Sequence, residues 1–513
     1  MRELTLRSVF VDALERFGTR PAITFRGRSH SYADVVSAAN QLAHRLAEAG
    51  VGPGTVVALL MSNCPEYVIA DQAIARCGAV KVPLSDMLSA SEIDYILADS
   101  GAQVAITDPG MLPAARQASS ARLDLIITAG PTRDCPAGVL AWADALAGQP
   151  TTVPDAHPGL GDLGLILYTG GTTGRPKGVM HTQCGLALNL YAHVMEMGLL
   201  DDEVLLLMSP LPHSAGFLLQ AGLLKGAQHF IERRFDPELA LERVTQERVT
   251  YTFMVPTMIY RVLDCAAGRD LDLRSLRTIL YGAAPITRER LEQGLATFGP
   301  VFMQLYGQSE APNFITRLRR EDHQLDPAAG HRLASCGQPG LMTEIKIVDE
   351  AGLELPVGQI GEVAARTPYT MTGYRGRPET TSATLRDGWL HTGDLGRVDH
   401  DGYLYLLDRK HDMIITGGLN VYSTEVENAV QACPGVRQVA VVGIPHPDWG
   451  EAVVAFVVPD AAGNFDTAKL LANCGAELSR YKLPKAVRVV DALPVTAYGK
   501  LDKKALRASW PGW

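Results

Sequence analysis

The stretch from Leu165 to Val179 reads LILYTGGTTGRPKGV, an apolar run that leads directly into a loop rich in glycine, threonine and lysine. The apolar half is typical of a buried β-strand. Glycines allow backbone N–H groups to curve around an anion, and hydroxyl groups and a lysine add donors and positive charge. We therefore predict a phosphate-binding loop. Its contributing residues are Thr169, Gly170, Gly171, Thr172, Thr173, Gly174 and Lys177.

This loop differs from the Walker A phosphate loop. That motif needs a Gly-Lys pair followed by Ser or Thr, whereas Lys177 follows Pro176 and precedes Gly178. A P-loop nucleotide hydrolase is therefore disfavoured. A flexible surface turn is the simpler alternative, but such turns rarely place Thr, Gly and Lys directly after a buried strand.

Other short apolar runs alternate with longer helix-like segments along the chain. They begin at Thr55 (TVVALLM), Leu163 (LGLILYT), Val249 (VTYTFMV) and Leu276 (LRTILYG). Strands that are apolar on both faces and alternate with helices predict an α/β fold of layered, largely parallel sheets. Ligand sites in such folds lie at the ends of the strands.

The chain is long enough for more than one domain. Its 513 residues exceed the usual size of a single hydrophobic core. The stretch from Gly393 to Asp412 is rich in charge and turn residues, and a separate helix and strand pattern follows it. We expect a large α/β N-terminal domain at 1–408, a hinge at 409–412 and a small α+β C-terminal domain at 413–513.

The composition argues against several classes of protein. A net charge of −9 and a pI near 5.8 provide no basic surface for nucleic acid. The eight cysteines form no CxxC pair, which favours reduced thiols over disulfides or a zinc site. The N-terminus lacks the apolar region of a secretory signal. These features predict a cytoplasmic protein.

One uncharged stretch, 204–224, approaches the length of a membrane span. Its prolines, Pro210 and Pro212, break helices, so we interpret VLLLM as a strand, SPLPHSAG as a loop and FLLQAGLL as a packed helix. We therefore expect no integral membrane segment.

Seven motifs occur in a fixed order along the chain. They are YTGGTTGRPKG from Tyr168, SPLPHSAGF from Ser209, YGAAPI from Tyr281, QLYGQSE from Gln304, WLHTGDLG from Trp389, LDRKHDMIITGGLNVYSTEVE from Leu407 and PVTAYGKLDKKALR from Pro494. In this order they resemble the adenylate-forming superfamily of acyl-CoA synthetases, nonribosomal adenylation domains and luciferases, with acyl- or aryl-CoA ligases the most similar. The resemblance implies an AMP-forming ligase that uses ATP and Mg²⁺ to convert a carboxylic acid to an acyl-adenylate and then to a thioester.

The resemblance also assigns the nucleotide site. Tyr306 would lie beside adenine, Ser309 near the α-phosphate, and Glu310 on Mg²⁺, an ion that needs few carboxylates beside phosphate oxygens and water. Asp394 would accept both ribose hydroxyls, and Arg409 would contact the nucleotide. The small or polar positions expected around adenine are Gly282, Ala283, Ala284, Gly307 and Gln308.

Catalysis is assigned by the same resemblance to Lys500, Glu310 and Thr169. Lys500 matches the lysine that bridges the carboxylate and the α-phosphate while the adenylate forms, where an ammonium stabilises the growing negative charge. The C-terminal domain would then rotate about His411, where relatives commonly have Asp or Lys. This rotation would withdraw Lys500.

The acid pocket is expected to be small and apolar. His213 matches the family's gating aromatic residue, which separates this pocket from the thiol tunnel. The SPLPHSAGF loop has no Asp to hold an ammonium group, so a hydrophobic or aryl acid is favoured over an amino acid. The residues expected to line the pocket are His213, Ser214, Pro256, Gly282, Gly307, Ala311 and Pro312.

The acceptor is expected to be coenzyme A. Gly417 and Gly418 would leave room for its pantetheine arm in a thiol tunnel. A standalone adenylation enzyme that loads a carrier protein in trans is the alternative, as is another nucleophile or another oxyanion, including nitrite in diazotising relatives. A catalytically inactive scaffold would be expected to lose Lys500, Glu310 or the threonine loop, all of which are present.

Overall fold

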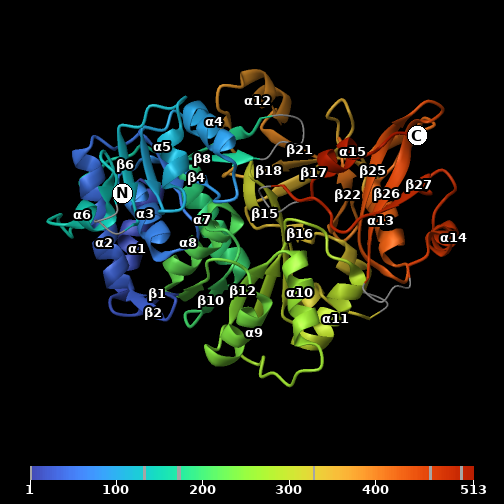
Figure 1. Cartoon of the computed structure of the whole chain (residues 1–513), viewed down its shortest axis with the longest axis horizontal. Coiled ribbons are helices and arrows are strands. Elements are labelled where there is room, and N and C mark those ends of the chain that lie inside the picture. Colours follow the sequence, from blue (N-terminus) through green and yellow to red (C-terminus); the bar gives the residue numbers. More distant parts are fainter. Residues whose placement is uncertain (1–2, 131–134, 170–174, 327–329, 461–464, 497–500) are drawn as a thin grey trace.

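Four β-sheets, with helices between and around them, make up the described part of the chain, residues 3–130, 135–169, 175–326, 330–460, 465–496 and 501–513 (Figure 1). In this computed structural model, two large sheets and a third, smaller sheet form the N-terminal part. C-terminal residues form the fourth sheet. The expected α/β class, with a large N-terminal and a small C-terminal part, is confirmed.

The first large sheet has eight strands in the order β19-β9-β8-β4-β3-β5-β6-β7, parallel except at β9 and β19. Its strand β8 is the apolar run that leads into the predicted phosphate loop. The strands are β3 (Val56–Leu60), β4 (Val80–Leu84), β5 (Val104–Thr107), β6 (Leu125–Thr128), β7 (Leu140–Ala141), β8 (Leu163–Thr169), β9 (Lys177–Thr182) and β19 (Gly373–Tyr374).

The second large sheet has nine strands in the order β16-β15-β14-β13-β12-β10-β11-β1-β2. Its central strands are parallel, and β14 and β15 form an antiparallel hairpin. The strands are β1 (Pro21–Phe25), β2 (Arg28–Ser31), β10 (Val204–Leu207), β11 (Gln228–Ile231), β12 (Tyr251–Met254), β13 (Thr278–Tyr281), β14 (Phe302–Gln308), β15 (Ala311–Leu318) and β16 (Gln338–Pro339).

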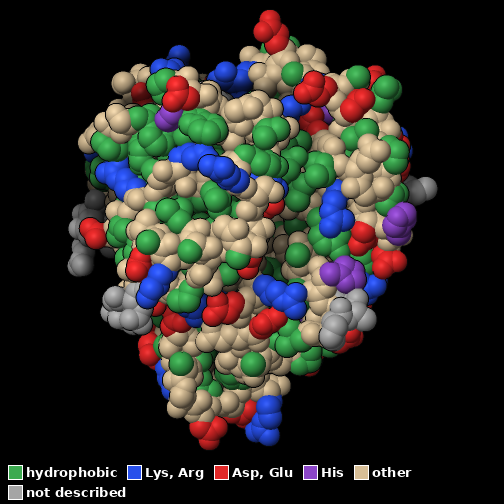
Figure 2. Space-filling model, turned by 90° about the vertical axis from the view of Figure 1, so that its right-hand side faces the viewer, with side chains coloured by type: hydrophobic (Ala, Val, Ile, Leu, Met, Phe, Trp, Pro, Cys, Tyr) green, Lys and Arg blue, Asp and Glu red, His purple; other side chains and the backbone are tan. Residues whose placement is uncertain are grey.

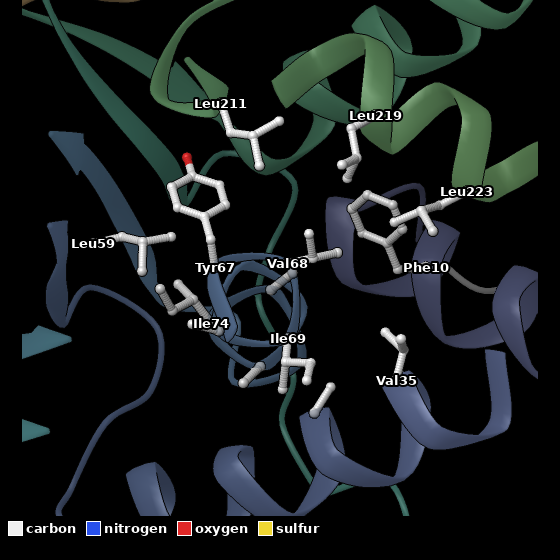
Figure 3. Packing of buried hydrophobic residues seen from close by; sticks show 14 of the residues in the cluster. Phe10, Val35, Leu59, Tyr67, Val68, Ile69, Ile74, Leu211, Leu219 and Leu223 are labelled. Carbon is white, nitrogen blue, oxygen red and sulfur yellow. The ribbon is translucent and has the colours of Figure 1, made fainter. Parts of the chain in front are cut away.

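A layer of helices lies between these two sheets. Figure 3 shows Phe10, Val68 and Leu219, from three different helices, packed together beside Leu59 of β3. The same core includes Leu205 of β10, so both sheets contribute to it. The helices of this layer are α1 (Leu6–Leu14), α2 (Tyr32–Glu48), α3 (Pro65–Arg76), α7 (Gln183–Met197) and α8 (Gly216–Lys225).

Other helices cover the outer faces of the sheets. Successive side chains of a strand point to opposite faces, so Val57 packs in the central core while Val56 and Ala58 pack in a second one. This second core contains α4 (Ala90–Ser100) and α5 (Leu112–Gln117). The outer face of the nine-stranded sheet packs against α9 (Pro237–Gln246), α10 (Pro256–Ala266) and α11 (Arg288–Phe298). The shorter helices α6 (Trp142–Leu146) and α12 (Pro378–Thr384) complete this part.

The chain passes from the third sheet to the fourth between β22 and β23. The third sheet contains β17 (Glu344–Val348), β18 (Gly361–Arg366), β20 (Leu385–Arg386), β21 (Trp389–Val398) and β22 (Leu404–Arg409). The fourth contains β23 (Ile414–Thr416), β24 (Leu419–Val421), β25 (Val436–His446), β26 (Gly450–Pro459) and β27 (Ala486–Val489). Its two faces pack against α13 (Ser423–Gln431) and α14 (Thr467–Glu477), and against α15 (Lys503–Ala508). The division at 409–412 stays a prediction.

Charges on the face occupied by the C-terminal region are mixed. Figure 2 views the molecule from that side and shows Lys and Arg side chains interspersed with Asp and Glu. Opposite charges therefore offset one another over short distances on this face.

Helices begin where the sequence supplies capping groups. The hydroxyl of Ser31 accepts from the backbone N–H of Asp34, whose side chain accepts from the N–H of Ser31, and α2 begins there. Ser89 and Glu92 form the same reciprocal pair at α4. Such caps each contribute about 1 kcal/mol because they satisfy donors that the first helical turn leaves unpaired.

The stretch predicted to be a strand, a loop and a helix is largely as expected. VLLLM contains β10, and FLLQAGLL lies in α8. Within SPLPHSAG the chain turns at Leu211–Ala215, but the backbone of His213 is not helical (φ −117°, ψ −149°), so the segment is kinked rather than a regular helix, as the loop prediction expected. No helix in the described part of the chain is long and apolar enough to cross a membrane. All eight cysteines are free thiols.

Candidate active site

The tip of the β14–β15 hairpin carries Ser309 and Glu310 between the paired residues Gln308 and Ala311. A close backbone approach shapes this hairpin. A Cβ atom at Gly307 would lie 2.6 Å from the backbone of Asn313, nearer than packed atoms approach one another. Glycine at this position is therefore required by the geometry of the tip.

Asp394, predicted to accept the ribose hydroxyls, is hydrogen-bonded to residues of β14 next to this tip. Its Oδ2 accepts from Tyr306 Oη at 2.6 Å and from Gln308 Nε2 at 2.7 Å. Arg409, its partner in the β21–β22 pairing, places Nε 3.4 Å from Oδ1. Burial, followed by the charge of Asp394, raises the pKa of Tyr306 well above its usual value, so the phenol stays a donor. Oδ2 of Asp394 thus accepts two hydrogen bonds from protein side chains, and Oδ1 faces Arg409.

Glu310 is held from the opposite side by Tyr374. The Tyr374 hydroxyl donates to Glu310 Oε1 at 2.6 Å, and Lys177 Nζ lies 4.4 Å from the centre of the Tyr374 ring. Burial, followed by Glu310, raises the pKa of Tyr374, so its hydroxyl also stays protonated. The second oxygen of Glu310 accepts nothing from the residues that the structure describes. This leaves it available to a cation, and the nearby ammonium can attract phosphate.

His181 fixes the backbone of the same tip. Its Nε2 lies 2.8 Å from the carbonyl oxygen of Ser309, which can only accept, so Nε2 carries the proton. Burial lowers the pKa of His181 to about 4, which keeps the ring neutral at pH 7. His181 and Lys177 both belong to β9, so one strand contacts the tip directly and also contacts Tyr374, which holds Glu310.

The segment after β13 contains Gly282, Ala283 and Ala284, which are expected to lie around adenine. A Cβ atom at Gly282 would lie 2.5 Å from the carbonyl oxygen of Leu305, which requires glycine there. Ala283 has a φ of 67°, a left-handed conformation that costs roughly 1 kcal/mol for a residue with a Cβ atom. Ala283 and Ala284 are exposed, so a role in core packing alone does not explain their small size.

Two of the predicted acid-pocket residues, Ser214 and Pro312, have hydrogen-bonding neighbours close to the hairpin. Ser214 follows His213 in the kinked segment before α8, and its carbonyl oxygen is 3.4 Å from Asn313 Nδ2. The carbonyl of Pro312 accepts from Asn189 Nδ2 at 3.1 Å. Ala311 is buried, and Pro256 begins α10 just beyond the end of β12.

The junction between the third and fourth sheets is anchored on both sides of the exposed residue His411. Asp408 accepts from the backbone N–H of Ser423, and Asp412 forms a 2.8 Å ion pair with Arg507. Ser423 and Arg507 both belong to the C-terminal region. A rotation about His411 would therefore have to break the contact of Asp408, while that of Asp412 could move with the C-terminal region.

The predicted thiol-tunnel glycines form the turn between β23 and β24. Their φ values are 57° at Gly417 and 78° at Gly418, which glycine adopts at no steric cost. Turn geometry is thus a second reason for glycine here, beside the predicted room for a pantetheine arm. Thr169 ends β8 opposite Lys177. Several predicted residues lie outside the described part of the chain, namely Gly170, Gly171, Thr172, Thr173, Gly174 and Lys500.

The sequence profile of AMP-binding enzymes matches residues 10–375, and that of the AMP-binding enzyme C-terminal domain matches residues 425–500. The chain belongs to the AMP-binding enzyme family. The expected membership of the adenylate-forming enzymes is thereby confirmed.

Relatives of this AMP-binding enzyme match it over nearly the whole chain. It is 40% identical over 492 residues to a feruloyl-CoA synthase of Amycolatopsis sp, covering 95% of each chain. It is 36% identical to the medium/long-chain-fatty-acid–CoA ligase FadD8 of Mycobacterium tuberculosis, covering 98% of this chain and 90% of FadD8. The structure of the amide bond synthetase McbA from Marinactinospora thermotolerans superposes with a TM-score of 0.89 at 33% identity, covering 98% of this chain and 99% of McbA.

Sequence reasoning missed several residues that shape the site of this AMP-binding enzyme. Tyr374 lies in a two-residue strand and His181 in an apolar one, where neither periodicity nor spacing distinguishes them. Each forms a hydrogen bond with a tip residue that is more than 60 positions away in the sequence. Asn313 was missed although it directly follows the predicted pocket residue Pro312. A polar residue there, between buried apolar neighbours, was the available signal.

Proposed function

We propose that this enzyme activates a carboxylic acid with ATP, releases pyrophosphate, and transfers the acyl group from the acyl-adenylate to the thiol of coenzyme A. The observation that carries the proposal is the convergence on one hairpin tip. Glu310 with Tyr374 and Lys177 lies on one side of it, and Asp394 with Tyr306 on the other. The residues proposed to bind Mg²⁺ and phosphate thus lie next to those proposed to bind ribose.

The residues present fit a single magnesium ion. The described residues contain no cluster of three or more carboxylate, histidine or cysteine ligands, and Mg²⁺ on ATP needs few protein ligands. Glu310 would hold the ion through the oxygen that Tyr374 leaves unused. Bound there, Mg²⁺ would neutralise negative charge on the phosphates of ATP.

The lysine and the threonine loop are proposed to complete the first half-reaction. Lys500 would bring its ammonium group between the acid carboxylate and the α-phosphate, where charge accumulates as the bond forms. Thr169 and the residues after it would hold the phosphates from the end of β8. Tyr306 and the backbone at Gly282 would hold adenine.

The acid is proposed to be hydrophobic or aryl. Its pocket would be formed by small or apolar residues at the hairpin and by the turn that contains His213 and Ser214, with no acidic side chain to hold an ammonium group. The feruloyl-CoA synthase and FadD8 names describe acids of this kind.

Thioester formation is proposed to follow a rotation of the C-terminal region about His411. The rotation would bring the β23–β24 turn, with Gly417 and Gly418, to the active site in place of Lys500. Both residues of the turn are glycines with positive φ. Because no side chain projects from the turn, its backbone can approach an extended pantetheine arm closely.

A different acceptor is the second candidate function. The close superposition with McbA favours this possibility, because an enzyme of the same fold is named an amide bond synthetase. A carrier protein in trans is a further form of this alternative.

The proposal is tested by acid-dependent exchange of labelled pyrophosphate into ATP, with aryl, medium-chain and amino acids. We expect exchange with an aryl or medium-chain acid, and loss of free coenzyme A thiol only when that acid and ATP are present. Exchange without thiol consumption, together with product on an amine or carrier protein, would establish the second candidate. No exchange with any acid would refute adenylation itself.

A further inference from the structure

Three buried polar side chains lie next to the predicted acid pocket. Asn189 and His193 project from α7, and Asn313 projects from β15. His193 is fully buried, Asn189 is 1% exposed and Asn313 is 5% exposed. The surroundings are aromatic, since the rings of Phe217 and Phe314 lie 5.7 and 5.0 Å from that of His193. Buried polar groups in an apolar environment are unfavourable unless hydrogen bonds satisfy them.

Donor and acceptor chemistry fixes the orientation of this network. His193 Nδ1 lies 2.7 Å from the carbonyl oxygen of Asn189, which can only accept, so Nδ1 carries the proton. Burial lowers the pKa of His193 to about 4, so the ring is neutral at pH 7 and its Nε2 has a lone pair. The atom of Asn313 that lies 2.9 Å from Nε2 must therefore be the donor Nδ2.

A second contact supports the same orientation of the Asn313 amide. Nδ2 also lies 3.4 Å from the carbonyl oxygen of Ser214, another atom that can only accept. With both protons of Nδ2 directed to His193 and Ser214, the amide oxygen Oδ1 points elsewhere. It accepts no hydrogen bond from the residues that the structure describes.

The neighbouring amide repeats this pattern. Asn189 Nδ2 donates to the carbonyl of Pro312, and its buried Oδ1 has no partner among the described residues. Two amide oxygens beside the acid pocket thus lack donors. Of the two, Asn189 Oδ1 is fully buried, and leaving a buried acceptor unpaired costs about 1–3 kcal/mol.

Asn313 is also in a conformation that few residues tolerate. Its φ is 68°, in the left-handed region, where Asn is one of the residues found most often after glycine. Its backbone faces Gly307, where any Cβ atom would collide with it. The amide is therefore held by a strained backbone on one side and by a buried histidine on the other, which favours precise placement of Oδ1.

Asn313 lies outside the hairpin tip, on the side of the predicted acid-pocket residues Ser214 and Pro312. Ser309 and Glu310 occupy the hairpin tip, and Asn313 lies three residues further along β15, beyond the buried Ala311. Ser214 and Pro312, predicted pocket residues, are the groups that the network contacts.

We infer that Oδ1 of Asn313 is the polar end of the acid pocket and accepts a hydrogen bond from a hydroxyl group that the acid carries opposite its carboxylate. This inference rests on the proposed function. His193 is a positioning residue, because it fixes which way the amide faces without itself touching the acid. The substrate class is thus narrowed to hydroxylated acids.

The test compares matched acids that differ by one hydroxyl group. Initial rates of pyrophosphate release, with hydroxylamine to trap the adenylate, give kcat/KM for 4-hydroxycinnamic and cinnamic acid, 4-hydroxyphenylacetic and phenylacetic acid, and an ω-hydroxy and a plain medium-chain acid. We expect the wild-type enzyme to favour the hydroxylated member of at least one pair by about 3- to 10-fold, the range of one net hydrogen bond. Equal values within every pair would overturn the inference.

Variants assign the preference to this network. Asn313→Gly accepts the positive φ and removes the amide, so the ratio within the favoured pair should fall to about one. His193→Gln retains an acceptor for Nδ2 and should preserve the ratio, whereas His193→Leu frees the amide to turn and should reduce it. Asn40→Ala is the matched control, because Asn40 is also a buried asparagine with two hydrogen bonds but lies in α2.

The outcomes separate this inference from the proposed function. Retention of the wild-type ratio by Asn313→Gly, or equal ratios in the two His193 variants, would overturn the inference while leaving acid activation intact. If Asn313→Gly does not fold, the His193 pair decides the question by the same ratio. An enzyme that activates no acid would overturn the proposed function and this inference together.

Discussion

Two hairpins of this enzyme carry residues of the proposed site, and they are built in opposite ways. The β14–β15 tip lies between sheets, and Tyr374, His181 and Met371 each hold it by a hydrogen bond. The β23–β24 hairpin is open to solvent. Its Ile415 and Leu419 are 50% and 49% exposed, and its turn consists of two glycines.

The difference indicates which parts must be in place before the substrates arrive. A preorganised tip can stabilise charge without rearranging during the reaction. The β23–β24 hairpin packs on one side into the C-terminal core and presents Ile415 and Leu419 to solvent on the other, which suits a part that is expected to move with the C-terminal region into and out of the site. We therefore expect changes at the tip to affect acid activation, and changes at the exposed hairpin to affect transfer to the thiol.

The largest effect is expected from Lys500→Ala. Loss of the ammonium should slow adenylate formation about 1,000-fold, while thioester formation from supplied acyl-adenylate should stay near the wild-type rate. Pyrophosphate exchange and thiol consumption measure the two steps separately. Lys504→Ala, an exposed lysine of α15, is the control. Equal loss of both steps would remove the assignment of Lys500 to the first step.

Glu310→Gln should have the next largest effect. Removing the charge should lower kcat/KM for ATP roughly 100-fold and raise the Mg²⁺ concentration that half-saturates the enzyme. Tyr374→Phe removes only the hydrogen bond to Glu310 and should shift the same Mg²⁺ titration less. A titration curve unchanged in Glu310→Gln would show that this carboxylate does not bind the ion.

The pH dependence of the free energy of unfolding should report on His181, the buried histidine at the β14–β15 tip. Burial lowers the pKa of His181 from its usual value to about 4. Between about pH 6.5 and 4 this histidine is therefore protonated in the unfolded chain but neutral in the folded protein. Stability from this group is present above pH 6.5 and is lost as pH falls through that window. Between pH 7 and pH 5 it should decrease by about 2 kcal/mol.

His181→Gln keeps a donor for Ser309 but does not titrate. Urea unfolding of both proteins at pH 7 and pH 5 should therefore show a shallower loss of stability in the variant. His193, His229 and His323 have the same direction of shift, so part of the decline remains. Identical declines in wild type and variant would mean that His181 is already protonated at pH 5.

The smallest effect is expected from Gly418→Ala in the exposed hairpin. Its φ of 78° makes alanine unfavourable by roughly 1 kcal/mol, so thioester formation should slow about fivefold with adenylation unchanged. Gly475→Ala in α14 is the control, because a Cβ atom there meets open space at an ordinary helical φ. A slower first step in Gly418→Ala would contradict the separation of the two hairpins.

Much of the architecture could be predicted from the sequence because the signals are local. Apolar runs such as LGLILYT become strands, and the alternation of strands with helices gives the layers. The resemblance assigned Tyr306 and Asp394 to one nucleotide site, and the two side chains are hydrogen-bonded to each other. The hold of Tyr374 on Glu310 and of His193 on Asn313 could not be predicted, because these contacts join elements far apart in sequence. The kink at His213 agrees with the loop expected from the prolines before it.

The shared layer of helices also has a consequence for how the chain becomes folded. The core around Val68 of α3 contains Leu59 from one large sheet and Leu205 from the other, so neither sheet has a complete core of its own. During synthesis, α1 to α3 must wait for α7, α8 and β10 before their apolar faces are covered. The two sheets should therefore unfold in one cooperative transition, and a fragment that ends before Val204 should aggregate rather than fold.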